Sequence, residues 1–108
     1  MYVWGLIGNR RIYDPEKQIF GENDGDQRIV LSLSLSPTCI FAILKSRNDQ
    51  STSNEVWVWG YSHRGMLGIS GITSLEKPTL LSELSSRKII QISSGELHVA
   101  ALTCMFAY

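Results

Sequence analysis

The chain has 108 residues and no formal net charge, because ten lysines and arginines balance ten aspartates and glutamates. This length allows one domain at most, and the balanced charge lacks the basic surface that binds a polyanion, so direct nucleic-acid binding is not expected. Cys39 and Cys104 are too few for the disulfide framework of a small secreted domain, and no secretory signal pattern opens the sequence. These features predict an intracellular protein, cytoplasmic or nuclear.

Short apolar blocks follow one another along the chain, and each has the length of a β-strand. They are rich in Val, Ile, Trp and Phe and are bounded by turn-forming residues. In chain order they are Tyr2–Trp4, Ile29–Leu35, Cys39–Leu44, Val56–Trp59, Ile89–Ile92 and Val99–Leu102. Only residues 75–84 approach helical spacing, and Pro78 lies inside that window. No run is long and apolar enough for a membrane span. The sequence therefore predicts an all-β protein without a membrane segment.

The two halves of the chain resemble each other. Tyr2-Val3-Trp4-Gly5 returns as Trp57-Val58-Trp59-Gly60, so that Trp4 corresponds to Trp59. The apolar blocks that begin at residues 29 and 41 return at residues 89 and 99, with slightly different spacings. The period lies just above the lengths of about 40–50 residues that are known for propeller repeats, and it predicts a repeat protein.

The second half resembles the repeat of the regulator of chromosome condensation (RCC) family. The resemblance is carried by "VWVWGYSHRGMLG", by a proline, and by "KIIQISSGELHVAALT". The matching positions are Trp59, Gly60, Gly65, Leu67, Gly68, Pro78, Gly95, His98 and Leu102. The first half is more divergent: it keeps Trp4 and Gly5, but Pro37 and Ile40 stand roughly where the repeat has glycine and histidine.

This resemblance implies a partial β-propeller, in which four-stranded blades surround a channel. The complete blade is expected from residues 29–35, 39–44 and 55–59, with a short outer strand near Leu67 or at residues 79–81. A half-blade of two strands is expected on either side. The expected organisation is a single propeller fragment, with repeat 1 at about 2–45, a linker loop at 45–55 and repeat 2 at about 56–103.

Several residues invite a chemical interpretation, and each also has a structural one. Gly60, Gly65 and Gly68 suit tight turns; a phosphate-binding loop would also need a lysine and a following helix. His98 has the chemistry of a general base or metal ligand, but the resemblance makes it a repeat residue whose ring hydrogen bonds fix strand packing. His63 and Arg64 lie in a turn that would either bind a partner or remain a solvated loop.

The remaining polar segments give no stronger signal. The acidic stretch at 21–26 lacks the ligand spacing of an EF-hand, and the polar loop at 45–55 offers Ser51, Thr52 and Ser53 as phosphorylation candidates. The two histidines and two cysteines have no zinc-ligand spacing. We therefore expect no catalytic residue, no metal and no cofactor.

The functional expectation is a non-catalytic protein-binding module. Members of the family act as guanine nucleotide exchange factors for small GTPases, so the resemblance implies a protein partner of that kind. The alternatives are the substrate-recruiting segment of a ubiquitin ligase and a truncated product without independent function. Two exposed half-blades also predict self-association, because one repeat unit cannot bury its apolar faces alone.

Overall fold

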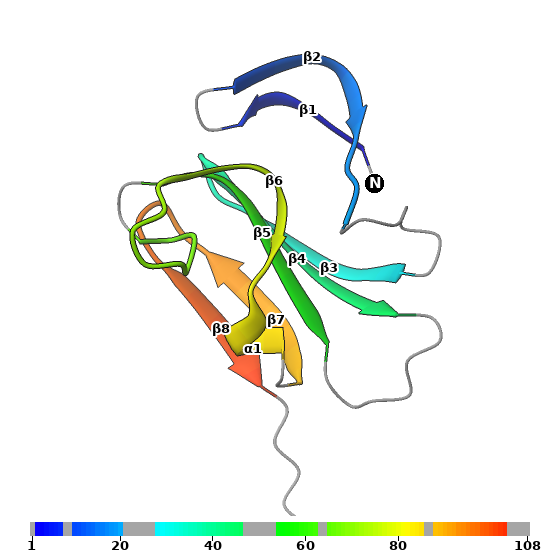
Figure 1. Ribbon diagram of the computed structural model, residues 1–108, viewed down its shortest axis with the longest axis vertical. Helices are drawn as coiled ribbons and strands as arrows, with labels where there is room; N and C mark the ends of the chain where they lie inside the picture. Colours follow the sequence, from blue (N-terminus) through cyan, green and yellow to red (C-terminus); the bar gives the residue numbers. More distant parts are fainter. Residues whose placement is uncertain are drawn as a thin grey trace, which may run out of the picture.

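Three antiparallel sheets follow one another along the chain (Figure 1). The computed structural model describes residues 2–7, 10–20, 28–46, 54–62, 65–85 and 88–103. The first sheet pairs β1 (Tyr2–Ile7) with β2 (Arg10–Lys17). The second has the order β3-β4-β5-β6, and its strands are Arg28–Leu35, Cys39–Ser46, Glu55–Tyr61 and Ser74–Leu80. The third pairs β7 (Ile89–Ser94) with β8 (Val99–Thr103).

This arrangement confirms the predicted fold class: one complete four-stranded blade flanked by two half-blades. Of the two positions expected for the outer strand, residues 79–81 overlap the end of β6, which spans residues 74–80, whereas Leu67 lies in the turn before it. Pro78 fits within β6 because an edge strand can leave one backbone position without a ladder hydrogen bond. The helix-like spacing over residues 75–84 resolves into this strand and the one-turn helix α1 (Ser82–Ser85). In the part of the chain that the structure describes, no helix is long and apolar enough to cross a membrane.

The complete blade has two apolar faces because its central strands β4 and β5 alternate side chains between them. One face, which we call the hairpin face, packs against the β7–β8 hairpin, and the opposite one, the tryptophan face, carries Trp57 and Trp59. Core residues of the hairpin face and the elements packed on it are Cys39, Phe41, Ile43, Val56, Val58, Met66, Leu67, Leu81, Ile89 and Ile92. Those of the tryptophan face are Ile40, Ala42, Leu44, Trp57 and Trp59, with Phe20 packed on them.

Two side-chain contacts hold the β7–β8 hairpin on the blade. Asn54 is 7% exposed, and its Nδ2 donates a hydrogen bond of 2.9 Å to the carbonyl oxygen of Ile89. The hydroxyls of Ser34 and Ser94 are 2.7 Å apart, and the backbone N–H of Ser94 also donates to Ser34 Oγ at 3.1 Å. The half-blade is therefore anchored at both ends of β7.

On the tryptophan face, Arg28 joins the starts of β3 and β5 to the segment after β2. Its Nε lies 2.8 Å from Glu55 Oε1, and its Nη1 donates to the carbonyl oxygen of Phe20 at 3.1 Å. The guanidinium also lies over the Trp57 ring, 5.5 Å from its centroid. The Phe20 ring meets Trp57 and Trp59 edge-on, with centroid distances of 5.5 and 5.7 Å. These contacts bind the first half-blade to the blade through Phe20, three residues after the end of β2.

Strand register shows how accurately the structural unit repeats. In β3–β4, Leu33 lies opposite Ala42, and in β7–β8, Ile92 lies opposite Ala101. Every other residue pair of β7–β8 lies the same number of residues along the chain from its equivalent pair in β3–β4. The register irregularity of β3, just after Val30, returns at the same place in β7. The sequence suggested two unequal spacings between the apolar blocks of the two halves. The structure corrects this: β3 and β4 are separated from β7 and β8 by the same number of residues.

The outer hairpins repeat in the same way. The irregularity between Val3 and Gly5 in β1 returns in β5 between residues 58 and 60. The partner strands β2 and β6 also match each other at one constant spacing, which places Pro15 at the position of Pro78. The first half therefore keeps the repeat proline, hidden from sequence comparison by the different length of the connecting loop.

Candidate interaction surface

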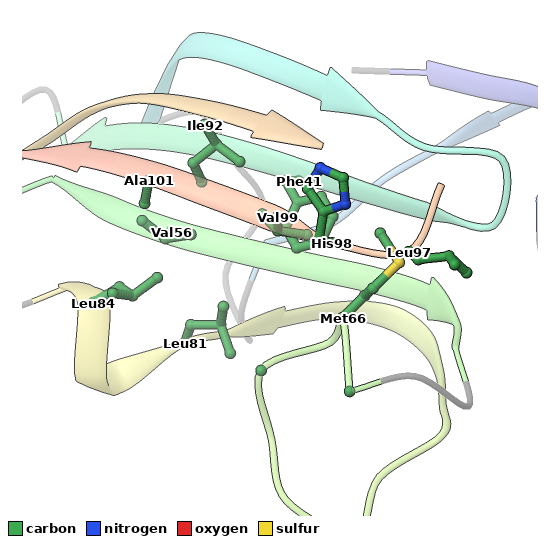
Figure 2. A pocket seen from close by; sticks show the side chains of 12 residues that line it. Phe41, Val56, Met66, Leu81, Leu84, Ile92, Leu97, His98, Val99 and Ala101 are labelled. Carbon is green, nitrogen blue, oxygen red and sulfur yellow. The ribbon is translucent and has the colours of Figure 1, made fainter. Parts of the chain in front are cut away.

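A cavity of about 470 Å³ opens between the hairpin face of the blade and the β7–β8 hairpin (Figure 2). Its blade side comes from β4, β5, the turn before β6, and the segment around α1. Its other side comes from β7, β8 and the turn that joins them. The residues that line it are Phe41, Val56, Gly65, Met66, Gly68, Leu81, Leu84, Ile92, Leu97, His98, Val99 and Ala101.

A glycine-bounded turn forms the floor of this cavity. The N–H of Gly68 donates to the carbonyl oxygen of Gly65 at 3.2 Å, and both glycines have positive φ, 76° and 77°. This turn directs Met66 and Leu67 inward, so that they are 6% and 0% exposed. The Gly-x-Leu-Gly element of the sequence thus contributes Met66 and Leu67 to the core of the hairpin face.

The chemistry of the cavity is that of an apolar binding groove. Among its lining residues, His98 alone is ionisable, and its side chain is exposed. The His98 carbonyl accepts a hydrogen bond of 2.8 Å from the N–H of Gly95, and a Cβ added to Gly95 would lie 3.1 Å from the histidine ring. Within the described ranges, no three His, Cys, Asp or Glu residues lie close enough to hold a metal ion. The groove can receive an apolar side chain.

Apolar side chains are also exposed at both ends of the repeat array. Tyr2 on β1 is 59% exposed, and Leu102 on β8 is 54% exposed. On β3, Leu33 and Leu35 are 47% and 66% exposed; they lie opposite Ala42 and Ile40, so they extend the tryptophan face. A set of this size at strand edges is typical of a surface that packs against another element.

Gly5 and Gly60 take equivalent positions but have different surroundings. Both have positive φ, 110° and 121°, in strands β1 and β5. A Cβ on Gly60 would overlap the carbonyl oxygen of Thr38 and lie 2.8 Å from the Cα of Cys39, whereas a Cβ on Gly5 would meet nothing within 4 Å. The repeat glycine is thus in close contact with a neighbouring strand in the complete blade and beside open space in the half-blade.

The structure places the other described positions of the predicted repeat in strands and turns. Trp4 is in β1, Trp59 is 3% exposed in β5, Pro78 is in β6, and Gly95 precedes the start of β8. His63 and Arg64, the predicted partner-binding loop, lie outside the described residues, as do the acidic stretch at 21–26 and the serines and threonine at 51–53. The role of each of these residues stays a prediction, including the ring hydrogen bonds of His98.

Sequence reasoning missed three residues that fix the arrangement. Asn54 stood at the end of a polar run and gave no sign that its side chain is buried. Arg28 also gave no sign, since its partners come from two separate segments, β5 and the residues after β2. Pro15 could have been found by aligning the two prolines and allowing loops of different length.

The fold and these surfaces define a class: a repeat-built β protein whose units are propeller blades with open ends. The family follows from comparison, because residues 53–102 match the model of the Regulator of chromosome condensation (RCC1) repeat. This segment of the chain is a repeat of the RCC1 family, which confirms the resemblance seen in the sequence. No solved structure matches the chain.

Curated relatives are longer proteins that share part of this chain. Probable E3 ubiquitin-protein ligase HERC3 of Homo sapiens is 40% identical over 53 residues, covering 49% of this chain and 5% of the relative. Protein RCC2 homolog of Danio rerio is 27% identical over 107 residues, 93% of this chain and 21% of the relative. Protein RCC1 of Candida albicans is 38% identical over 58 residues, 47% and 12% respectively. The chain thus spans about a fifth or less of the length of these relatives.

Proposed function

We propose that this chain is a non-catalytic protein-binding module built from RCC1-type propeller blades, and that its partner is a small GTPase. The observation that carries the proposal is the RCC1 repeat at residues 53–102, together with blade geometry that repeats in register across the whole described chain. The groove between blade and hairpin is apolar, which suits contact with a protein surface better than bond-breaking chemistry. The expected location is inside the cell, in the cytoplasm or nucleus.

In this proposal the binding residues lie in loops at the rim of the blades, held by rigid strands. His63 and Arg64 are the first choice, because they fall between the Trp-Gly and Gly-x-Leu-Gly elements of the matched repeat. A zero net charge supplies no net attraction to steer the partner, so this proposal assigns recognition to local complementarity.

The proposal is tested by measuring the affinity of the chain for a panel of purified small GTPases, each prepared nucleotide-free and GDP-bound. A factor that accelerates nucleotide release binds the nucleotide-free form more tightly, because the coupling between nucleotide and factor is reciprocal. We expect at least a tenfold preference for the nucleotide-free form of one GTPase, a preference of about 1.4 kcal/mol. Replacing His63 and Arg64 with alanine should weaken that binding, and replacing the exposed Glu76 with alanine should not.

A second function is favoured by the names of other relatives. Probable E3 ubiquitin-protein ligases HERC3 and HERC4 are 40% and 41% identical to this chain over about half of its length. In this alternative the module recruits a ubiquitination substrate for a ligase domain. Binding of a partner with the same affinity in every nucleotide state would favour recruitment, and binding to no GTPase of the panel would contradict the proposal that the partner is a small GTPase.

A further inference from the structure

Among the described residues, one edge of β8 and one edge of β1 lack the strand neighbour that the equivalent edge has in the complete blade. β8 pairs with β7 and β1 pairs with β2, and each of these sheets has two strands. In the complete blade the corresponding edge of β4 is occupied by β5. Unpaired backbone donors and acceptors at such edges bind any strand that fits them.

The repeated register identifies the strand that fits. β8 is equivalent to β4, because every pair in β7–β8 is displaced by one constant spacing from its counterpart in β3–β4. β1 is equivalent to β5, because the two strands share a register irregularity at the same place and both carry the Val-Trp-Gly sequence. β8 therefore lacks a neighbour equivalent to β5, and β1 is a strand of that kind. In the same way, β1 lacks a neighbour equivalent to β4, and β8 is a strand of that kind.

The glycine in β1 supports this assignment. Gly60 is required in β5 because Thr38 and Cys39 approach its α-carbon closely. Gly5 keeps a positive φ, but a Cβ there would meet nothing within 4 Å. The repeat spacing places Leu97 and His98 at the positions of Thr38 and Cys39. The segment leading into β8 of a second copy would thus lie in the open space beside Gly5.

The exposed apolar side chains also complement each other. Tyr2 occupies the position of Trp57, whose side chain is 5% exposed in the blade, whereas Tyr2 is 59% exposed. A strand added beside β8 in the same register would bring Tyr2 to the apolar groove lined by Val56 and Leu81. It would also bring Leu102 of one copy toward the open part of the tryptophan face of the other, at Leu33.

We propose that β8 of one copy pairs antiparallel with β1 of a second copy of this chain, so that β7, β8 and the second copy's β1 and β2 form a hybrid four-stranded blade. Transferring the β4–β5 register places Ala101 opposite Tyr2 and His98 opposite Gly5 of the second copy. The interface is head-to-tail, because one copy presents β8 and the other presents β1. The eight described strands of each copy are the content of two blades, so a closed ring built from these strands contains an even number of blades. Rings of about four to eight blades correspond to two to four copies.

A cysteine cross-link tests this register. Opposite residues in an antiparallel pair have Cα atoms about 4.5–5.5 Å apart, within the range that a disulfide spans. In a background with Cys104→Ser, one preparation carries Tyr2→Cys and a second carries Ala101→Cys. Mixing the two under mild oxidation should give a covalent dimer. The matched control pairs Tyr2→Cys with Ala100→Cys, one residue out of register and on the opposite face, and should cross-link at least tenfold more slowly.

A second experiment measures assembly without a cross-link. Light scattering over a range of concentrations should show the mass rising to two to four copies, with a β-strand circular dichroism spectrum throughout. Tyr2→Lys adds a charge to an exposed position and should weaken association by at least tenfold while leaving that spectrum unchanged. Tyr13→Lys, on the exposed and unrelated position of β2, should associate like the unsubstituted chain.

Three outcomes would overturn the proposal. One is a folded chain that stays monomeric at every concentration. Another is a cross-link between two Ala101→Cys copies that outcompetes the mixed product, since that would show a symmetric interface. The third is equal cross-linking at Ala100 and Ala101, because strand pairing in a defined register separates these neighbours onto opposite faces.

Discussion

Replacing Gly60 and Gly5 with alanine, separately, tests whether the repeat glycine is needed for its backbone angle or for a close strand contact. Both residues have φ well into the positive range, 121° and 110°, so alanine introduces a similar backbone strain at each site, about 1–3 kcal/mol. At Gly60 the new Cβ also overlaps the Thr38 carbonyl and lies 2.8 Å from the Cα of Cys39. Relief of such an overlap requires strand displacement, which costs about 1–3 kcal/mol more.

We therefore expect Gly60→Ala to lower the free energy of unfolding by about 2–6 kcal/mol and Gly5→Ala by about 1–3 kcal/mol. In a domain of this size, each kcal/mol corresponds to about 4–8 °C in Tm. The measurement is urea denaturation followed by tryptophan fluorescence, since Trp57 and Trp59 are buried and change environment on unfolding. It is made at a protein concentration low enough for light scattering to show a single copy.

Equal destabilisation by the two substitutions would refute this reasoning, because it would mean that the contact with Thr38 and Cys39 contributes nothing. The pair also has a second readout. If β8 of another copy occupies the space beside Gly5, then Gly5→Ala should abolish assembly while the isolated chain stays folded. Retention of assembly by Gly5→Ala would show that no strand approaches Gly5 as closely as β4 approaches Gly60.

Three further substitutions test the packing of the blade. Asn54→Ala removes the hydrogen bond to the Ile89 carbonyl; it should cost about 1–3 kcal/mol and accelerate hydrogen exchange in β7 and β8, and unchanged exchange there would contradict the anchoring role. Glu55→Gln removes the charge that pairs with the guanidinium on β3; it should cost about 0.5–1.5 kcal/mol in urea denaturation, a difference that shrinks in high salt if the effect is electrostatic. Leu67→Ala, at a fully buried position, should lower the free energy of unfolding by about 2–5 kcal/mol. Leu80→Ala, at a position that is 38% exposed, should lower it by less than about 1 kcal/mol. Similar losses of stability would mean that the turn before β6 is not part of the core.

The central strands β4 and β5 could be predicted from the sequence because they are nearly continuous apolar runs. Cys39–Leu44 and Val56–Trp59 lie within β4 and β5, and both are buried on two faces. The outer strands could not be located in this way. β2 and β6 contain charged residues and a proline each, since they face solvent at the edge of a sheet, and such strands carry little hydrophobic pattern.

The candidate site was less accessible to sequence reasoning than the fold. Gly65, Leu67, Gly68 and His98 were found as repeat positions, but the groove beside them depends on how two hairpins pack. Asn54 and Arg28 act through backbone carbonyls of residues far away in the chain, 35 and 8 positions distant. A donor that bonds to a backbone carbonyl leaves no pattern in the sequence, because every residue type offers that acceptor.

What the sequence by itself determined is the unit: an all-β chain with a repeated Val-Trp-Gly strand, an RCC1-type turn, and the alternation that gives the blade two apolar faces. Residue types set these features because strand period, glycine at positive φ and proline at an edge are local requirements. Only the tertiary structure decided the register. It showed that β8 repeats β4 at one constant spacing and that β1 repeats β5 at another. It also showed that Gly5 lies beside open space, because strand neighbours are set by packing between segments that are distant in the chain.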